Sequence, residues 1–349
     1  MISKRIRTLA PYKTETTGAR VRLSSNELSL KLPEEVKRSI GEVVSKIPLN
    51  RYPDPEAGEL KEVIAYRFGV NPENIVLGNG SDELIYYLSI AVGEYEKGVF
   101  YPVPTFSMYG ISAQVLGREK IEVSLNDEFD IDLQKSLEQI RDKKPILAYF
   151  AYPNNPTGNC FSEDKIKTIR DEGVFVVVDE AYYHYSGKTF LKEALEREDT
   201  VVLRTLSKIG MAGLRVGILI GKEEVVKEIN KIRLPFNITY PSQVIAVLML
   251  RDFYHVIEEA IQRVVSERQR VYEEMLKLEG IRVYPSEANF IFFKSLYFSG
   301  DELYRRLLQK GVLVRNFSYM VADCLRVSIG EREENDAFLQ ALHEVLTTY

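Results

Sequence analysis

Short apolar runs alternate with polar, helix-like stretches between about residues 73 and 221 of this chain. Several runs are rich in β-branched residues and show no polar alternation, which indicates strands that are covered on both faces. Strands that alternate with helices predict an α/β architecture with a largely parallel sheet. The expected strands span residues 74–78, 98–103, 120–125, 145–152, 174–180, 200–206 and 216–221.

Both ends of the chain break this alternation. Residues 1–35 contain no strong strand run and are expected to form an N-terminal arm. After about residue 240, a long helical region precedes short strands in "IRVYPS", "ANFIFFK", "GVLVRNF" and "LRVSIG", the pattern of a smaller α+β lobe. We therefore predict a large domain over residues 36–240 and a small C-terminal domain over residues 241–349.

Composition excludes several classes of protein. The formal net charge of −5 argues against bulk nucleic-acid binding, because no basic excess is available to neutralise phosphates. The two cysteines, Cys160 and Cys324, are expected to be free thiols in a reducing compartment. No apolar run is long enough to span a membrane, and the basic N-terminus has no apolar signal-peptide core. The three histidines are too scattered for a metal site. We expect a cytoplasmic protein without a metal.

Polar side chains follow four of the expected strands, and in open α/β sheets ligands gather beyond the carboxyl ends of the strands. Each of these residues has a simpler interpretation, as a turn, a helix cap or a solvated lysine. Their combination in this order favours one shared crevice. The residues concerned are Gly80, Ser81 and Asp82 at a helix start, Asn155 in "PNNPTG", Asp179 and Tyr182 in "VVVDEAYY", and Ser207 and Lys208 in "TLSKIG".

Pyridoxal phosphate (PLP) chemistry needs this set of groups. Lys208, among small residues, can form a Schiff base with the cofactor aldehyde. Asp179 fits the carboxylate that keeps the pyridine nitrogen protonated. Asn155 and Tyr182 could donate hydrogen bonds to the phenolate oxygen of the cofactor ring.

The phosphate of PLP needs backbone amides at a helix start, hydroxyl groups and a cation. The helix opening at Gly80, Ser81 and Asp82 supplies the amides. Ser207 supplies a hydroxyl and Arg215 a guanidinium. Phe106 follows another expected strand and could stack on the face of the pyridine ring.

Three motifs in this order, "PNNPTG", "VVVDEAYY" and "TLSKIGMAGLRVG", resemble class I/II aminotransferases, the PLP enzymes of fold type I. Five further segments, "LSSNE", "RYPD", "GNGSDELI", "PTFSMY" and "LRVSIG", are similar to histidinol-phosphate aminotransferases. The resemblance covers nearly the whole chain. It implies an α/β large domain with a mostly parallel, mixed seven-stranded sheet covered by helices, beside a smaller α+β domain and the arm.

The resemblance also implies roles for single residues. Lys208 would carry the cofactor and move the proton at the substrate Cα, and Tyr52 would reach the cofactor phosphate from the neighbouring subunit of a homodimer. Asn26 would lie at the substrate. Arg326 would clamp the α-carboxylate of glutamate, and Arg315 the phosphate of histidinol phosphate. The implied reaction of histidine biosynthesis is ping-pong transfer of an amino group between L-glutamate/2-oxoglutarate and imidazole acetol phosphate/L-histidinol phosphate.

Other functions remain open at this stage. "SSNEL" lacks the proline that commonly follows "NE" in relatives. The loop over residues 316–324 varies within the family that the chain resembles. An aromatic aminotransferase or a threonine-phosphate decarboxylase on the same scaffold is the main alternative. A nucleotide-binding oxidoreductase or NTPase fits less well, because "GNGSDE" lacks the third glycine of a dinucleotide fingerprint and Glu223 replaces the Ser/Thr of a phosphate loop.

Overall fold

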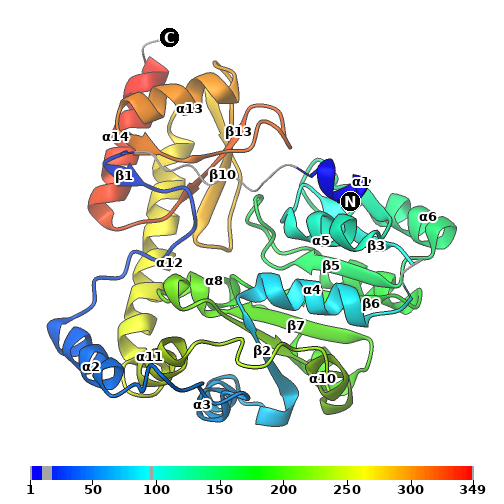
Figure 1. The fold of residues 1–349 in the computed structure, drawn as a ribbon. Coiled ribbons are helices and arrows are strands. Elements are labelled where there is room, and N and C mark those ends of the chain that lie inside the picture. Colours follow the sequence, from blue (N-terminus) through cyan, green and yellow to red (C-terminus); the bar gives the residue numbers. More distant parts are fainter. Residues whose placement is uncertain (1, 10–17, 95–96, 348–349) are drawn as a thin grey trace.

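The computed structural model describes residues 2–9, 18–94 and 97–347 (Figure 1). All of the strands expected between residues 74 and 221 form, within two residues of the predicted ends. They make one seven-stranded sheet in the order β2-β8-β7-β6-β5-β3-β4. The strands are β2 (Ile75–Asn79), β3 (Val99–Val103), β4 (Lys120–Ser124), β5 (Leu147–Ala151), β6 (Phe175–Asp179), β7 (Thr200–Thr205) and β8 (Val216–Ile220).

The sheet is mixed because one strand is reversed. β3 to β7 pair in parallel, whereas β8 is antiparallel to both of its neighbours, β2 and β7. In β8, Gly217 lies opposite Gly78 of β2 and Thr205 of β7. A Cβ at Gly217 would come within 2.3 Å of the Gly80 carbonyl carbon, so only glycine lets the loop after β2 lie over β8. The predicted mostly parallel, mixed α/β sheet is confirmed.

Both faces of this sheet are covered, which explains the absence of polar alternation. In β5, Leu147, Tyr149 and Ala151 pack in one cluster, while Ala148 and Phe150 pack in another, because neighbouring side chains point to opposite faces. The first cluster includes residues of α4 (Ser81–Ala91), α5 (Met108–Leu116) and α10 (Glu223–Asn230). The second includes residues of α6 (Leu133–Lys143), α7 (Glu163–Asp171) and α9 (Leu191–Glu196).

A second, antiparallel sheet follows the long helical region, in the order β12-β13-β10-β9. The helical region is divided into α11 (Tyr240–Arg251) and α12 (Tyr254–Leu276). The other helices here are α13 (Gly300–Gln309) and α14 (Arg332–Thr347). The strands are β9 (Ile281–Val283), β10 (Phe290–Ser295), β12 (Arg315–Asn316) and β13 (Cys324–Ser328). These elements form the α+β part that the C-terminal sequence predicts.

The N-terminal segment touches both parts of the molecule. β1 (Val21–Arg22) pairs in parallel with β11 (Val312–Leu313), beside the small sheet. The short helix α1 (Lys4–Arg7) lies against α5, where the Gln114 side chain donates a hydrogen bond to the Arg5 carbonyl oxygen. Residues 10–17 of the predicted arm lie outside the described residues. Two more helices follow the arm, α2 (Glu34–Ser45) and α3 (Gly58–Phe68).

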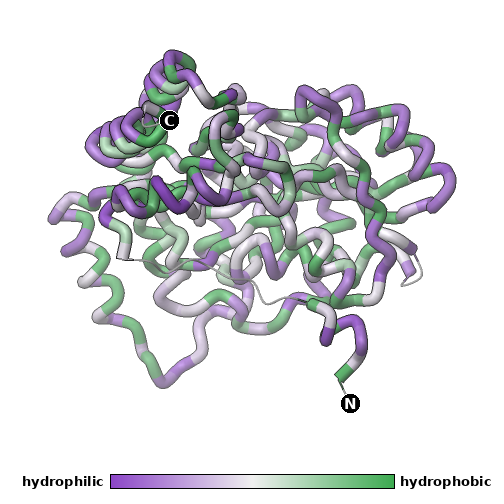
Figure 2. Tube along the Cα trace, turned by 90° about the horizontal axis from the view of Figure 1, so that it is seen from above, coloured by the Kyte–Doolittle hydropathy of each residue, from purple (hydrophilic) through white to green (hydrophobic). Residues whose placement is uncertain are grey.

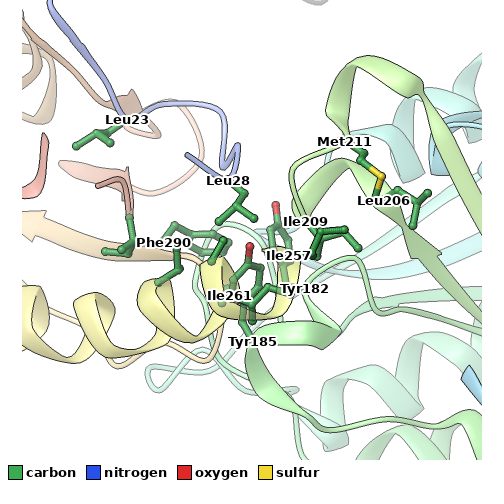
Figure 3. Packing of buried hydrophobic residues seen from close by; sticks show 14 of the residues in the cluster. Leu23, Leu28, Tyr182, Tyr185, Leu206, Ile209, Met211, Ile257, Ile261 and Phe290 are labelled. Carbon is green, nitrogen blue, oxygen red and sulfur yellow. The ribbon is translucent and has the colours of Figure 1, made fainter. Parts of the chain in front are cut away.

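One hydrophobic cluster joins the two parts. Figure 3 shows Leu28 and Phe290 on one side, Ile257 and Ile261 of α12 below, and Leu206 and other residues of the turn after β7 on the opposite side. Seen from above in Figure 2, the peripheral helices alternate between hydrophilic and hydrophobic stretches, as expected for helices that bury one face. The two parts of the molecule therefore share one continuous hydrophobic core.

Candidate active site

A cavity of about 490 Å³ lies at the carboxyl ends of β5, β6 and β7, on the side that faces the small sheet. A larger hollow of about 840 Å³ surrounds the amino ends of the same strands, but it holds none of the predicted site residues. The cavity at the carboxyl ends contains all of the predicted site residues except Gly80 and Tyr52. The predicted residues that line it are Asn26, Ser81, Asp82, Phe106, Asn155, Asp179, Tyr182, Ser207, Lys208, Arg215, Arg315 and Arg326.

Asp179, the last residue of β6, is a buried carboxylate at the floor of the cavity. The Tyr109 hydroxyl donates a hydrogen bond of 2.8 Å to its Oδ2, and the Ala181 amide donates one of 3.2 Å to its Oδ1. Burial raises the pKa of Asp179 to about 6, although these two donors act in the opposite direction. No cation of the described residues forms an ion pair with Asp179.

Lys208 ends the short 3-10 turn Leu206–Lys208 that follows β7. Its side chain is half-buried, and its Nζ lies 3.4 Å from the carbonyl oxygen of Ser25, to which it donates. The same Nζ lies 5.9 Å from the centre of the Tyr182 ring. The turn is held by the Tyr185 hydroxyl, which donates to the Lys208 carbonyl oxygen. The amine therefore lies in the cavity with only a weak partner of its own.

An anion-binding corner lies where α4 begins. Arg215 has a left-handed backbone (φ 55°) and donates hydrogen bonds to Ser207 Oγ at 3.3 Å and to Asp82 Oδ2 at 3.2 Å. Gly80 (φ 79°) precedes the helix, and a Cβ there would come within 2.3 Å of Arg215 Nη2. Gly80 does not line the cavity itself, but its missing side chain leaves space for the guanidinium. The corner combines a helix N-terminus, a hydroxyl and a cation.

Arg326 and Arg315 lie opposite each other on the antiparallel strands β13 and β12. Arg326 is buried and donates to Asn155 Oδ1 and to the Ser24 carbonyl oxygen. Its guanidinium lies 5.1 Å from the ring centres of both Phe290 and Phe317. Because directly opposed residues share one face of a sheet, the two arginines place two positive charges at the same wall of the cavity.

Arg315 is the less restrained of the two arginines. Its side chain is half-buried, and among the described residues it has no hydrogen-bond or ion-pair partner. Phe317 and Tyr319 follow it in the chain and stack at 5.8 Å, with the Tyr319 ring largely exposed at the cavity. This wall can bind an anion and place a flat, partly apolar group beside it.

Asn26 and Tyr182 are joined to each other at the rear of the cavity. Asn26, with φ 56°, donates from its side chain to the Tyr182 hydroxyl at 2.9 Å. Its side-chain oxygen accepts from Ser328 Oγ at 2.9 Å. The buried amide of Asn26 thus fixes the Tyr182 hydroxyl. Its expected substrate contact stays a prediction.

Tyr52 lies apart from the other predicted residues, whereas Phe106 lies among them. Tyr52 is 78% exposed, stacks on Phe236 at 4.5 Å and does not line the cavity of its own chain. Phe106 lines the cavity and contacts Tyr109 edge to face, with ring centres 5.7 Å apart. The expectation that Tyr52 serves a neighbouring subunit stays a prediction.

Sequence reasoning missed Tyr109, the direct partner of Asp179. A signal for it was present, because Phe106 and Tyr109 are three residues apart in "PTFSMY", the spacing that places two side chains on one face of a helical turn. It also missed Ser24 and Ser25, whose carbonyl oxygens accept from Arg326 and Lys208. Neither position has a side-chain signature, since the backbone makes the contact.

No helix in the described part of the chain is long and apolar enough to cross a membrane. Within residues 2–9, 18–94 and 97–347, no group of three His, Cys, Asp or Glu residues could hold a metal ion. Cys160 and Cys324 are free thiols.

The fold and this cavity agree with a match of residues 20–342 to the family model for aminotransferase class I and II. The chain belongs to this family of aminotransferases, as the sequence motifs indicate.

Among curated relatives, a histidinol-phosphate aminotransferase of Aquifex aeolicus (strain VF5) is 62% identical over 99% of this chain and 98% of its own. Among solved structures, histidinol-phosphate aminotransferase from Sinorhizobium meliloti in complex with pyridoxal-5'-phosphate has a TM-score of 0.87 at 22% identity, covering 99% and 98% of the two chains. L-threonine-O-3-phosphate decarboxylase from Porphyromonas gingivalis has a TM-score of 0.80 at 19% identity, covering 94% and 99%. The fold alone therefore does not separate a transaminase from a decarboxylase.

Proposed function

We propose that this chain is a PLP-dependent histidinol-phosphate aminotransferase of histidine biosynthesis. It transfers an amino group between L-glutamate/2-oxoglutarate and imidazole acetol phosphate/L-histidinol phosphate. The observation that carries the proposal is the pairing of Arg315 with Arg326 in the cavity that also holds Lys208 and Asp179. The two amino donors, L-glutamate and L-histidinol phosphate, both carry anionic groups that these arginines can bind. The full-length similarity to the Aquifex aeolicus enzyme supports the same substrates.

The residues of the cavity fit PLP at two separate points. Asp179 is a buried carboxylate that forms no ion pair among the described residues, which suits a protonated pyridine nitrogen. Arg215, Ser207 and the start of α4 form the corner for the phosphate, and a Cβ at Gly80 would disturb it. When bound, PLP supplies an electron-accepting ring that stabilises negative charge at the substrate Cα.

The chain's own groups then have distinct tasks. Lys208 Nζ would hold PLP by its aldehyde carbon and, as a free amine, would move the proton at the substrate Cα. Tyr182 and Asn155 would donate to the phenolate oxygen of the cofactor, and Asn26 holds the Tyr182 hydroxyl in place. Because Asn155 also accepts from Arg326, it links the cofactor side of the cavity to the substrate side.

The arginine wall serves both half-reactions. Arg326 binds the α-carboxylate of glutamate, where a planar guanidinium can form two parallel hydrogen bonds. Arg315 binds the phosphate of histidinol phosphate. Phe317 and Tyr319 offer an apolar face to the rest of that substrate. Because the same wall receives either anion, amino donor and amino acceptor bind in turn, which gives ping-pong kinetics.

The proposal extends to assembly, location and domains. Tyr52, exposed in the single chain, reaches the cofactor phosphate of the partner subunit in a homodimer with shared active sites. The enzyme is cytoplasmic. The arm over residues 1–35, the large domain over 36–240 and the small domain over 241–349 remain the proposed division of the chain.

The test is an assay of the PLP-loaded protein with L-histidinol phosphate and 2-oxoglutarate. We expect glutamate to form, with parallel double-reciprocal plots when both substrates are varied. Phenylalanine and threonine phosphate, offered in parallel, identify an aromatic aminotransferase or a decarboxylase. Absence of glutamate with histidinol phosphate, together with turnover of either alternative, would overturn the proposed substrate.

A further inference from the structure

Asp179 is held by a phenol that comes from a distant part of the chain. Tyr109, on α5, donates a hydrogen bond of 2.8 Å to Asp179 Oδ2, across 70 positions in the sequence. Its side chain is fully buried. Among the described residues, the second oxygen of Asp179 accepts a hydrogen bond from the Ala181 amide alone. Tyr109 therefore supplies the shorter of the two hydrogen bonds that orient this carboxylate within the described part of the chain.

The position of the Tyr109 ring is fixed from several sides. It stacks on Tyr149 with ring centres 4.7 Å apart and planes within 3°, and Phe106 contacts it edge to face. Ser112 Oγ donates to the Tyr109 carbonyl oxygen at 2.9 Å, and Ser89 Oγ shares hydrogen bonds with both Ser112 and Tyr149. A ring held in this way cannot turn its hydroxyl away from Asp179 without disturbing the core.

The phenol is a donor that keeps its proton. Burial and the neighbouring Asp179 charge both raise the pKa of Tyr109 well above its ordinary value. Burial raises the pKa of Asp179, whereas the hydrogen bond donated by Tyr109 lowers it. The Tyr109 hydroxyl thus favours the charged form of Asp179 without competing for the proton.

We propose that Tyr109 is a positioning residue of this site, whose hydroxyl holds the Asp179 carboxylate charged and oriented toward the cationic ring nitrogen of PLP. The inference rests on the proposed cofactor and deepens it. Tyr109 lies beside Asp179 in the cavity wall and acts through that carboxylate. Its removal therefore affects how tightly PLP binds and how that binding depends on pH, in addition to turnover.

The test compares Tyr109→Phe with Tyr149→Phe. Each substitution removes one buried phenol oxygen from the same stacked pair, but the Tyr149 hydroxyl bonds to Ser89 and to the Ile85 carbonyl oxygen instead of Asp179. We expect Tyr109→Phe to weaken PLP binding to the apo protein about tenfold, since hydrogen bonds to charged groups are the stronger ones. Tyr149→Phe should change it less than about twofold. Equal PLP affinity in both variants would overturn the inference.

A pH titration gives a second readout. The groups that face Asp179 are Tyr109, the Ala181 amide, Asp82 and Lys208. PLP affinity should fall as the pH drops through the pKa of Asp179, because the protonated acid no longer attracts the cationic ring nitrogen. Without the Tyr109 donor that pKa rises, so in Tyr109→Phe the fall should begin at a higher pH. An unchanged pH profile would contradict the inference.

A double-variant comparison guards against a general packing defect. In an Asp179→Asn background, adding Tyr109→Phe should cost little further PLP affinity if the tyrosine acts through Asp179. The same tenfold loss in both backgrounds would assign Tyr109 a purely structural role. If the wild-type protein binds PLP but does not turn over histidinol phosphate, the proposed substrate fails while this PLP-affinity test still applies. If it binds no PLP, both proposals fail.

Discussion

Asp179 and Glu180 are neighbours in the chain and both are buried, yet they serve different regions of the molecule. Glu180 accepts hydrogen bonds from Arg204, Thr189 and the Phe190 amide, and its ion pair with Arg204 is closed at 2.9 Å. Asp179 lines the cavity and accepts hydrogen bonds from a hydroxyl and an amide. Among the described residues, no cation forms an ion pair with it.

The difference shows how a buried charge can mark a binding site. The Glu180–Arg204 pair is complete within the chain and supports the turn after β6, with Arg204 also lying 3.7 Å from the Tyr183 ring centre. A buried carboxylate without its own cation is costly unless a ligand supplies one. Asp179 is therefore assigned to ligand binding, whereas Glu180 stabilises the fold.

The largest expected effect comes from Asp179→Asn, which keeps the side-chain volume and removes the charge. We expect kcat/KM to fall on the order of 10³-fold, the size seen when one preorganised electrostatic partner is lost. The apo protein should be at least as stable to urea, because a buried charge has been removed. Steady-state kinetics and urea unfolding measure the two effects. A strongly destabilised apo protein would contradict the assignment of Asp179 to the ligand.

Arg204→Met tests the opposite member of the comparison. It leaves Glu180 buried without its cation, and we expect the free energy of unfolding to fall by about 3–5 kcal/mol. The double variant Glu180→Gln/Arg204→Met should regain much of this loss. Urea unfolding measures both. If Arg204→Met alone unfolds like the wild type, the pair does not support the fold.

The pH dependence of apo-protein stability should report the burial of Asp179 directly. Burial raises the pKa of Asp179 from the usual 3.8 to about 6, which corresponds to roughly 3 kcal/mol. Because the folded-state pKa is the higher one, this contribution is present at low pH and is lost as the pH rises from about 4 to about 6. Asp179→Asn should therefore gain stability relative to the wild type over that range. A constant difference in unfolding free energy would contradict the raised pKa.

The smallest effect is expected from Gly80→Ala at the phosphate corner. Alanine at φ 79° is strained by about 1–3 kcal/mol, and its Cβ would meet Arg215 Nη2. Gly173→Ala is the matched control, since Gly173 has φ 86° with no atom within 4 Å of an added Cβ. Both variants should lose a similar amount of stability in thermal unfolding, but only Gly80→Ala should lose PLP affinity. Equal PLP affinity of the two variants would contradict the assignment of Arg215 to the phosphate corner.

The sequence predicts the central sheet well because its strands are buried on both faces and stand out as apolar runs. The reversal of β8 is not visible in the same way, since an apolar run has no direction. Nor could the segment "GVLVRNF" show that it divides, with Val312 pairing with β1 and Arg315 with β13. Pairing partners depend on tertiary packing that a local pattern does not contain.

The same division applies to the candidate site. Residues at strand ends, such as Asp179 and Lys208, could be placed from the sequence because the carboxyl ends of parallel strands meet. Tyr109 is harder to place, because its spacing from Phe106 indicates a shared helical face but not that its hydroxyl reaches Asp179, 70 positions away. The hydrogen bonds of the Asn26 side chain with Tyr182 and Ser328 likewise join segments that are far apart in the chain.

The most direct test of this account is to locate the cofactor on the chain. The PLP-loaded protein would be reduced with borohydride, digested, and its peptides identified by mass spectrometry. The account predicts one pyridoxyl group per chain, on the peptide that contains Lys208, and none in Lys208→Ala. A label on a different lysine, or no label in a protein that still turns over histidinol phosphate, would contradict it.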